Sequence, residues 1–233
     1  MADKNILKHT EVDMTKWFAD LPNSFVDELE PILYPPDQYG HLELAVYQGL
    51  DYTSLNLSEK GEIDLLVFPL NCPENATALQ VKQTKFLRDV KGREYFEKNI
   101  RKKVKAGIEQ SMRDWRTGFW QTFFLLFIEY DGQSNYHGFG APPPSMFESI
   151  EGVVLATSAS VSENDNVGLS LVTVSQTGTK SINFSGGIAP KHIRGAKKQP
   201  QPSCLTDSLR GLPKVERHYC NVPGCLQTFL KIE

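Results

Sequence analysis

The feature that most constrains the fold is an apolar run near the middle of the chain. Residues 120–130 read WQTFFLLFIEY, and Asp131-Gly132 ends the run as a turn. A strand with one face in water alternates apolar and polar residues, whereas a strand covered on both faces is apolar at nearly every position. We therefore expect a central strand in an α/β fold, within a sheet flanked by helices.

Composition narrows the class of protein. The chain has 233 residues, of which 40% are apolar and 23% charged, as in ordinary globular proteins. It contains no run of 18 apolar residues, and its start, MADKNILKHTEVDM, has no apolar core. Four cysteines are too few for a disulfide scaffold. We expect a cytoplasmic protein with no signal peptide and no membrane partner.

A charged hairpin precedes the central strand. Glu62-Ile63-Asp64 leads into LLVFPL, which is typical of a buried strand, and residues 78–84 (ALQVKQT) are expected to form the next strand. Side chains alternate across a strand, so Gln80 and Lys82 share one face. Antiparallel pairing can then bring Asp64 beside Gln80.

These residue types suit metal-assisted hydrolysis of phosphodiesters. Asp64 offers an anionic oxygen and Gln80 an amide oxygen to Mg²⁺ or Mn²⁺. Lys82 can orient a water molecule and offset charge on a phosphate. Glu43, on a helix expected over residues 37–49, is the candidate for a further ligand. Other candidates remain, and they are Glu28, Glu30, Glu62, Glu109 and Gln110.

The order of these parts resembles the PD-(D/E)xK, restriction-endonuclease-like nuclease superfamily. In that pattern a helix bearing Glu precedes a hairpin bearing Asp and then (Glu/Gln)-x-Lys, and a helix and a strand follow. Here residues 37–130 supply the match, with Gln80-Val81-Lys82 similar to Mrr-type members. The resemblance implies a restriction-endonuclease-like core with a central mixed sheet, and a metal-dependent nuclease. Gln in place of Glu removes one negative charge from the implied metal site.

Charge is segregated along the chain. Residues 1–81 carry 4 basic and 14 acidic groups (net −10), whereas residues 82–105 carry 10 basic and 3 acidic groups (net +7). Apolar residues recur every four positions from 96 to 112, which predicts an amphipathic helix over 92–115. Its basic face predicts contacts to nucleic acid, with DNA as the expected substrate, or is simply a solvated surface. The candidate phosphate-binding residues are Lys85, Lys98, Arg101, Lys102 and Lys105.

Four segments are expected. Residues 1–36 form an N-terminal helical extension with a helix near 24–32, and residues 37–146 form the nuclease-like core. Within the core, LELAV could alternatively be a strand, and residues 133–146 are expected to form a loop. Residues 147–203 are a β-rich extension, with strands at EGVVLATSAS and GLSLVTVSQT and a basic linker over 189–203. This additional β structure could serve a homodimer. Residues 204–233 form a tail containing Cys and His.

The tail and the core each leave an alternative open. Cys204, His218, Cys220 and Cys225 are residue types that bind Zn²⁺, although their spacing matches no familiar zinc motif and buried thiols would explain them equally. A zinc-stabilised interaction protein is therefore one alternative. The other is a catalytically inactive nuclease-fold module that binds nucleic acid or a protein partner.

Overall fold

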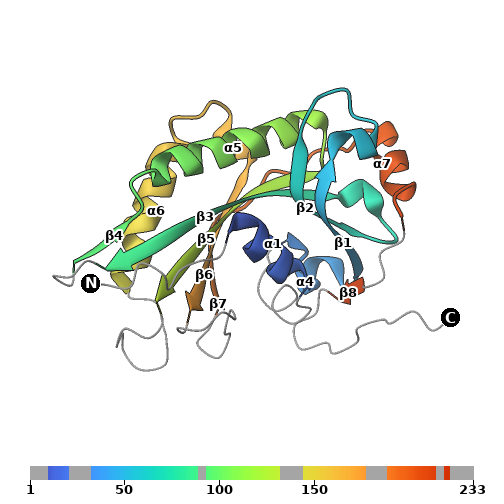
Figure 1. The fold of residues 1–233 in the computed structure, drawn as a ribbon. Coiled ribbons are helices and arrows are strands. Elements are labelled where there is room, and N and C mark those ends of the chain that lie inside the picture. The colour runs from blue at the N-terminus through green and yellow to red at the C-terminus, as the bar shows by residue number, and fades with distance from the viewer. Residues whose placement is uncertain are drawn as a thin grey trace.

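The computed structural model describes residues 10–20, 33–88, 93–131, 144–176, 188–213 and 218–220. Within them, eight strands form one mixed sheet in the order β7-β6-β5-β3-β2-β1-β8, with β4 paired to β3 (Figure 1). The strands are β1 (Glu43–Asp51), β2 (Glu62–Pro69), β3 (Thr77–Arg88), β4 (Glu94–Phe96), β5 (Gln121–Asp131), β6 (Gly168–Gln176), β7 (Ile188–Arg194) and β8 (His218–Cys220).

Strand direction changes across the sheet. β1, β2 and β3 run antiparallel in sequence order, whereas β3, β5 and β6 run parallel to one another. Parallel neighbours need a crossover of a dozen or more residues. Helices α5 (Ile100–Thr117) and α6 (Pro144–Ser158) supply the two crossovers.

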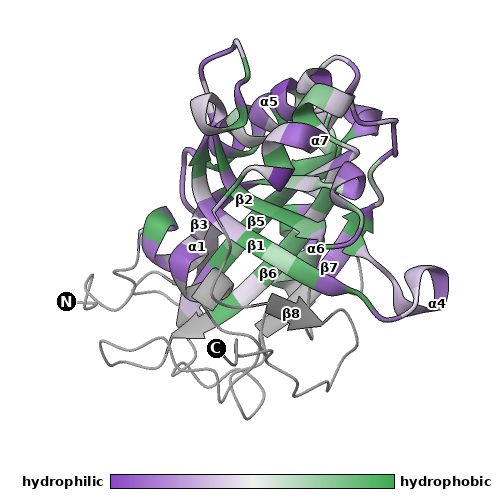
Figure 2. Cartoon of the chain, turned by 90° about the vertical axis from the view of Figure 1, so that its right-hand side faces the viewer, coloured by the Kyte–Doolittle hydropathy of each residue, from purple (hydrophilic) through white to green (hydrophobic). Residues whose placement is uncertain are grey.

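The helices lie on both sides of the sheet. α5 and α6 cover one face, and α1 (Glu11–Asp20) and the short α4 (Pro36–Tyr39) lie on the other (Figure 1). Helix α7 (Ser203–Arg210) adds Leu205 and Leu209 to a core cluster that also contains residues of β1 and β2. Hydrophobic residues concentrate along the central strands, and hydrophilic ones gather on the outward sides of α5 and α7 (Figure 2).

The central strand confirms the prediction from its apolar run. Successive β5 residues point to opposite faces and are buried on both: Phe123, Leu125 and Phe127 lie in one core cluster, and Phe124, Leu126 and Ile128 in another. The second cluster also contains Ile108 of α5 and Ile150 of α6. The hairpin expected over residues 62–84 is confirmed as β2 and β3, and the strand in GLSLVTVSQT is confirmed as β6.

The helix predicted over residues 37–49 is wrong. Only Pro36–Tyr39 is helical, and β1 follows from Glu43. Leu42, Val46 and Leu50 are four apart, a spacing that also fits the two-residue period of a strand. Backbone pairing with β2 on one side and β8 on the other stabilises the strand. The alternative prediction of a strand at LELAV is therefore confirmed.

The strand predicted at EGVVLATSAS is also wrong, because residues 151–158 lie in α6. Met146, Ile150 and Val154 recur every four residues and are buried against the sheet, so packing outweighs the strand preference of the two valines. The helix predicted over 92–115 begins only at Ile100, after β4. The linker predicted over 189–203 instead contains most of β7.

The helix predicted near 24–32 and most of the loop predicted over 133–146 lie outside the described residues. The boundaries of the four predicted segments stay a prediction. Among the described helices, none combines the length and the apolar character that crossing a membrane requires.

Candidate functional site

The candidate site lies where β2 and β3 separate. The two strands pair only from Leu65 to Val67 and from Thr77 to Leu79. Asp64 is the first β2 residue beyond this pairing, and its Oδ2 accepts the backbone N–H of Val81 at 2.6 Å. The Asp64 carboxylate thus accepts a β3 backbone N–H that is no longer paired with the β2 backbone. This hydrogen bond holds the carboxylate at the point where the two strands separate.

Gln80 points from β3 toward helix α5 and is 1% exposed. Its Nε2 donates to the backbone oxygen of Glu62 at 2.7 Å and to Oδ2 of Asp114 at 2.9 Å. Both partners are acceptors, so the amide nitrogen faces them and the amide oxygen faces elsewhere. Among the described residues, none donates a hydrogen bond to that oxygen.

Lys82 shares the face of Gln80, as the alternation predicts. Its Nζ donates to Oε1 of Glu11 at 2.9 Å and to the backbone oxygen of Val81 at 2.8 Å. A Cβ at Gly107 of α5 would lie 3.0 Å from Cγ of Lys82 and 2.2 Å from a ring carbon of Phe124. Glycine therefore lets α5 approach close enough to enclose the lysine stem.

Glu11 comes from the opposite side of the sheet, on the first turn of α1. Thr10 and Asp13 start that helix with a reciprocal capping box: the Asp13 N–H donates to Oγ1 of Thr10, and the Thr10 N–H donates to Oδ2 of Asp13. The second oxygen of Glu11, Oε2, accepts the backbone N–H of Gln83 at 3.3 Å. Two carboxylates, Asp64 and Glu11, thus bind alternate N–H groups of the unpaired β3 edge.

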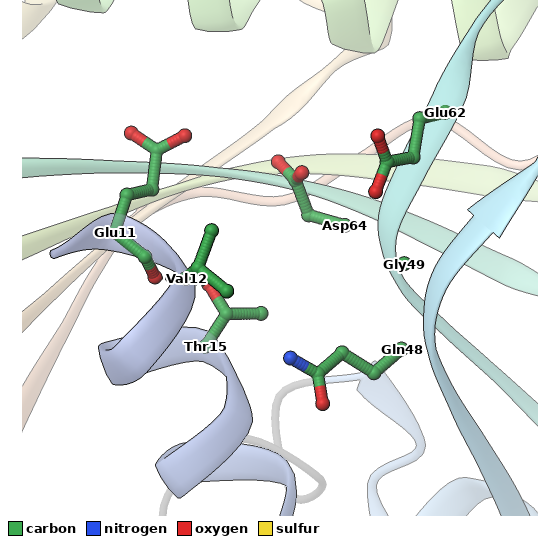
Figure 3. A pocket seen from close by; sticks show the side chains of 7 residues that line it. All are labelled: Glu11, Val12, Thr15, Gln48, Gly49, Glu62 and Asp64. Atoms are coloured by element: carbon green, nitrogen blue, oxygen red, sulfur yellow. Dashed lines mark hydrogen bonds between the residues drawn. The ribbon is translucent and has the colours of Figure 1, made fainter.

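A pocket of about 190 Å³ opens beside these groups, between α1 and the β1–β2 pair (Figure 3). The Asp64 and Glu62 side chains reach into the same space from β2, and Gln48 lies across from Thr15. Gly49, opposite Asp64 in β1, has φ +59°. The lining residues are Glu11, Val12, Thr15, Gln48, Gly49, Glu62 and Asp64.

The electrostatics of Asp64 reflect this enclosure. Burial raises the pKa of Asp64 above its ordinary value, and the nearby Glu11 and Glu62 carboxylates add to the rise. The hydrogen bond from Val81 and the charge of Lys82 act in the opposite direction on that pKa. A cation placed near Asp64 would reverse the effect of the neighbouring carboxylates.

A buried acid lies behind the site. Asp114 of α5 is fully buried, and its Oδ1 accepts a hydrogen bond from the hydroxyl of Tyr52. Burial raises the pKa of Asp114 to about 7, against the hydrogen bonds from Tyr52 and Gln80, which lower it. Burial likewise raises the pKa of Tyr52, and the Asp114 charge adds to that rise.

The donors fit a hard divalent cation. Mg²⁺ usually binds through one or two carboxylates and keeps several waters. Asp64, Glu11 and Glu62 line the pocket and offer such oxygens, and Gln80 lies next to Glu62, to whose backbone oxygen its Nε2 donates. In the part of the chain that the structure describes, no group of three or more His, Cys, Asp or Glu residues stands close enough to hold a metal by itself.

The structure separates Glu43 from this site. Glu43 is the first residue of β1 and lies six residues from Gly49, about 20 Å along a strand. Among the alternatives, Glu62 lines the pocket, Glu109 is exposed beside Lys105, and Gln110 lies one turn before Asp114. Glu28 and Glu30 lie outside the described residues.

Sequence reasoning missed Glu11 and Asp114. For Glu11, the available signal was the Thr10-x-x-Asp13 capping box, which marks a helix start. For Asp114, the available signal was the spacing of Gly107, Ser111 and Asp114, which places these three small or polar residues on one face of the helix, where all are buried.

The predicted basic residues divide into two groups. Lys98, just before α5, and Arg101, Lys102 and Lys105 in its first turns are exposed. Nζ of Lys105 lies 3.8 Å from Oε1 of Glu109. Lys85 lies on the opposite face of the sheet, with its Nζ 4.0 Å from Glu129. The α5 residues form one surface, and Lys85 lies apart from it.

The predicted zinc ligands stay a prediction. Cys204 is a free, exposed thiol on α7. His218 and Cys220 lie in β8, whose backbone pairs with β1, and Cys225 lies outside the described residues.

Comparison of the chain with known protein families, with curated proteins and with solved structures gives no match.

Proposed function

We propose that this protein is a metal-dependent nuclease that hydrolyses phosphodiester bonds, with DNA as the substrate. The observation that carries the proposal is that Asp64, Gln80 and Lys82 each bind the backbone where β2 and β3 separate. An acid and an amide oxygen are groups that bind Mg²⁺, and a partly buried ammonium can offset charge on a phosphate.

The order of elements supports the resemblance to the PD-(D/E)xK nucleases. Helix α1 bearing Glu11 precedes β2 with Asp64 and β3 with Gln80-Val81-Lys82, and α5 and β5 follow. In this proposal Glu11, rather than Glu43, is the upstream acid, and the core is restriction-endonuclease-like.

Each side chain has a distinct role in the proposed reaction. Asp64 and Gln80 hold Mg²⁺ or Mn²⁺, with Glu11 or Glu62 assisting. When bound, the metal polarises the phosphate and offsets the charge that develops on it. Lys82 donates a hydrogen bond to the attacking water or to a phosphate oxygen, and Glu11 keeps the ammonium beside Asp64 until substrate arrives.

The exposed start of α5 is the proposed surface for the nucleic-acid backbone. Arg101, Lys102 and Lys105 are exposed on the same helix whose buried Gly107 packs against Lys82. Phosphate contacts of this kind position a duplex without reading its sequence.

The test is cleavage of supercoiled DNA, single-stranded DNA and RNA with Mg²⁺ or Mn²⁺. Asp64→Asn can still accept the Val81 N–H, so the variant retains the fold while losing the charge. Lys82→Met keeps the stem against Gly107 and loses the ammonium. We expect both variants to lose cleavage, while Asp207→Asn, at an exposed position on α7, cleaves normally. Equal cleavage by the wild type and Asp64→Asn would refute the proposal.

One observation favours the inactive binding module as a second candidate. The Lys82 ammonium already has two acceptors within its own chain, Glu11 and the Val81 carbonyl. In a binding module this ion pair is simply structural. DNA binding by the wild type with no cleavage in either metal, unchanged in Asp64→Asn, would identify the module.

A further inference from the structure

The Gln80 amide is fixed in one orientation by its surroundings. Both hydrogen bonds from Nε2 go to acceptors, the Glu62 carbonyl and the Asp114 carboxylate. Turning the amide over would place its oxygen against two other oxygens. The amide oxygen is therefore left for another partner, and in the proposed site that partner is the metal.

The acceptor on α5 is itself held firmly. Asp114 is fully buried, and its second oxygen accepts the hydroxyl of Tyr52, which is also fully buried. The guanidinium of Arg113 lies 6.0 Å from the centre of the Tyr52 ring. With both oxygens engaged, the orientation of the Asp114 carboxylate is fixed by its two donors, the Tyr52 hydroxyl and the Gln80 amide.

This arrangement also accounts for glutamine at position 80. A glutamate there would place its carboxylate about where Nε2 now lies, 2.9 Å from Oδ2 of Asp114 and 2.7 Å from the Glu62 carbonyl. Two buried carboxylates at that separation cannot both be ionised without a large cost. A donor at residue 80 is thus required by the acceptor at residue 114, although the two lie 34 positions apart in sequence.

We propose that Asp114 is a positioning residue of the nuclease site, which holds Gln80 so that its carbonyl oxygen, and not its nitrogen, is presented to the metal. The inference rests on the proposed function. Asp114 itself touches neither metal nor substrate. Loss of such an outer partner typically weakens metal binding tenfold to a hundredfold.

The first experiment measures Mn²⁺ binding by electron paramagnetic resonance, which does not depend on cleavage. Asp114→Ala removes the acceptor, and we expect its Mn²⁺ dissociation constant to rise at least tenfold. Asp207→Asn is the control for an aspartate far from Gln80. Circular dichroism monitors the fold, and a folded Asp114→Ala with wild-type Mn²⁺ affinity would overturn the inference.

The second experiment tests the chemical match and remains informative if Asp114→Ala does not fold. Gln80→Glu is introduced into the Asp114 chain and into an Asp114→Asn chain, whose amide can donate to the new glutamate. We expect Gln80→Glu to lower the urea midpoint by on the order of 1 M beside Asp114 and by clearly less beside asparagine. Rescue is partial, because the Glu62 carbonyl still loses its donor.

Mn²⁺ affinity should follow the same pattern. We expect the Gln80→Glu/Asp114→Asn chain to bind Mn²⁺ about tenfold more tightly than Gln80→Glu alone. Equal midpoints and equal affinities in the two chains would overturn the inference while leaving the nuclease proposal in place. A wild-type chain that neither binds Mn²⁺ nor cleaves any substrate would overturn both.

Discussion

Replacing Asp114 by asparagine should change how stability depends on pH. Asparagine has the shape of aspartate and can satisfy Gln80 and Tyr52 with its own oxygen and nitrogen, but it does not titrate. The comparison therefore isolates the protonation of one buried carboxyl group. Asp207→Asn, at an exposed position on α7, is the matched control.

The magnitude follows from the burial of Asp114. Burial raises its pKa from 3.8 to about 7, so between those pH values the folded chain holds a proton that the unfolded chain releases. The stabilising contribution is complete below about pH 4 and is lost as pH rises to about 7. A pKa difference of about 3 corresponds to about 4 kcal/mol. The free energy of unfolding of the wild type, relative to Asp114→Asn, should fall by roughly that amount.

Urea unfolding at 25 °C, followed by circular dichroism at several pH values from 4.5 to 7.5, measures this difference. The free energy of unfolding of the wild type, minus that of Asp114→Asn, should decrease or change sign as pH rises. The same difference between the wild type and Asp207→Asn should stay nearly constant. The reasoning would be refuted if the difference in free energy of unfolding between the wild type and Asp114→Asn does not depend on pH. It would also be refuted if the wild type becomes the relatively more stable chain at high pH.

Three further predictions concern the site and its supports. Lys82→Met should lower the cleavage rate at least about a hundredfold with little change in DNA affinity, as gel shifts beside cleavage assays would show. Gly107→Ala should destabilise the chain by about 1–3 kcal/mol in urea unfolding, since the new Cβ meets the Phe124 ring. Replacing Arg101 and Lys102 by alanine should weaken DNA binding and reduce its salt dependence by about one phosphate contact per residue, measured by anisotropy at several salt concentrations.

The hairpin could be predicted because its signals are local. The apolar run after Asp64 and the alternation through Gln80-Val81-Lys82 each lie within one strand, and adjacent strands joined by a short turn usually pair. The central strand was predictable for a similar reason. Burial on both faces is recorded in a single stretch of sequence, with no need to know its neighbours.

The residues that complete the site could not be found in the same way. Glu11 meets Lys82 across 71 positions of sequence, and Asp114 meets Gln80 across 34. The local sequence around Glu11 or around Asp114 predicts a helix, but it does not indicate which strand that helix will pack against. The four-residue spacing of apolar residues around Glu43 predicts a helix before the hairpin, but strands share that spacing.

The separation of β2 and β3 explains why acids gather at this place. A strand that loses its neighbour exposes backbone N–H groups that need acceptors. Asp64 and Glu11 supply them to Val81 and Gln83, each with a single oxygen. The other oxygen of Glu11 accepts a hydrogen bond from Lys82, and in the proposed site Oδ1 of Asp64 is the atom that binds the cation. The same contacts that satisfy the open edge of β3 therefore fix the geometry that the proposed hydrolysis requires. Substitutions that remove the carboxylates entirely will disturb the strand edge. Amide substitutions keep an acceptor oxygen and remove only the charge, so they test the charge while the strand edge stays intact.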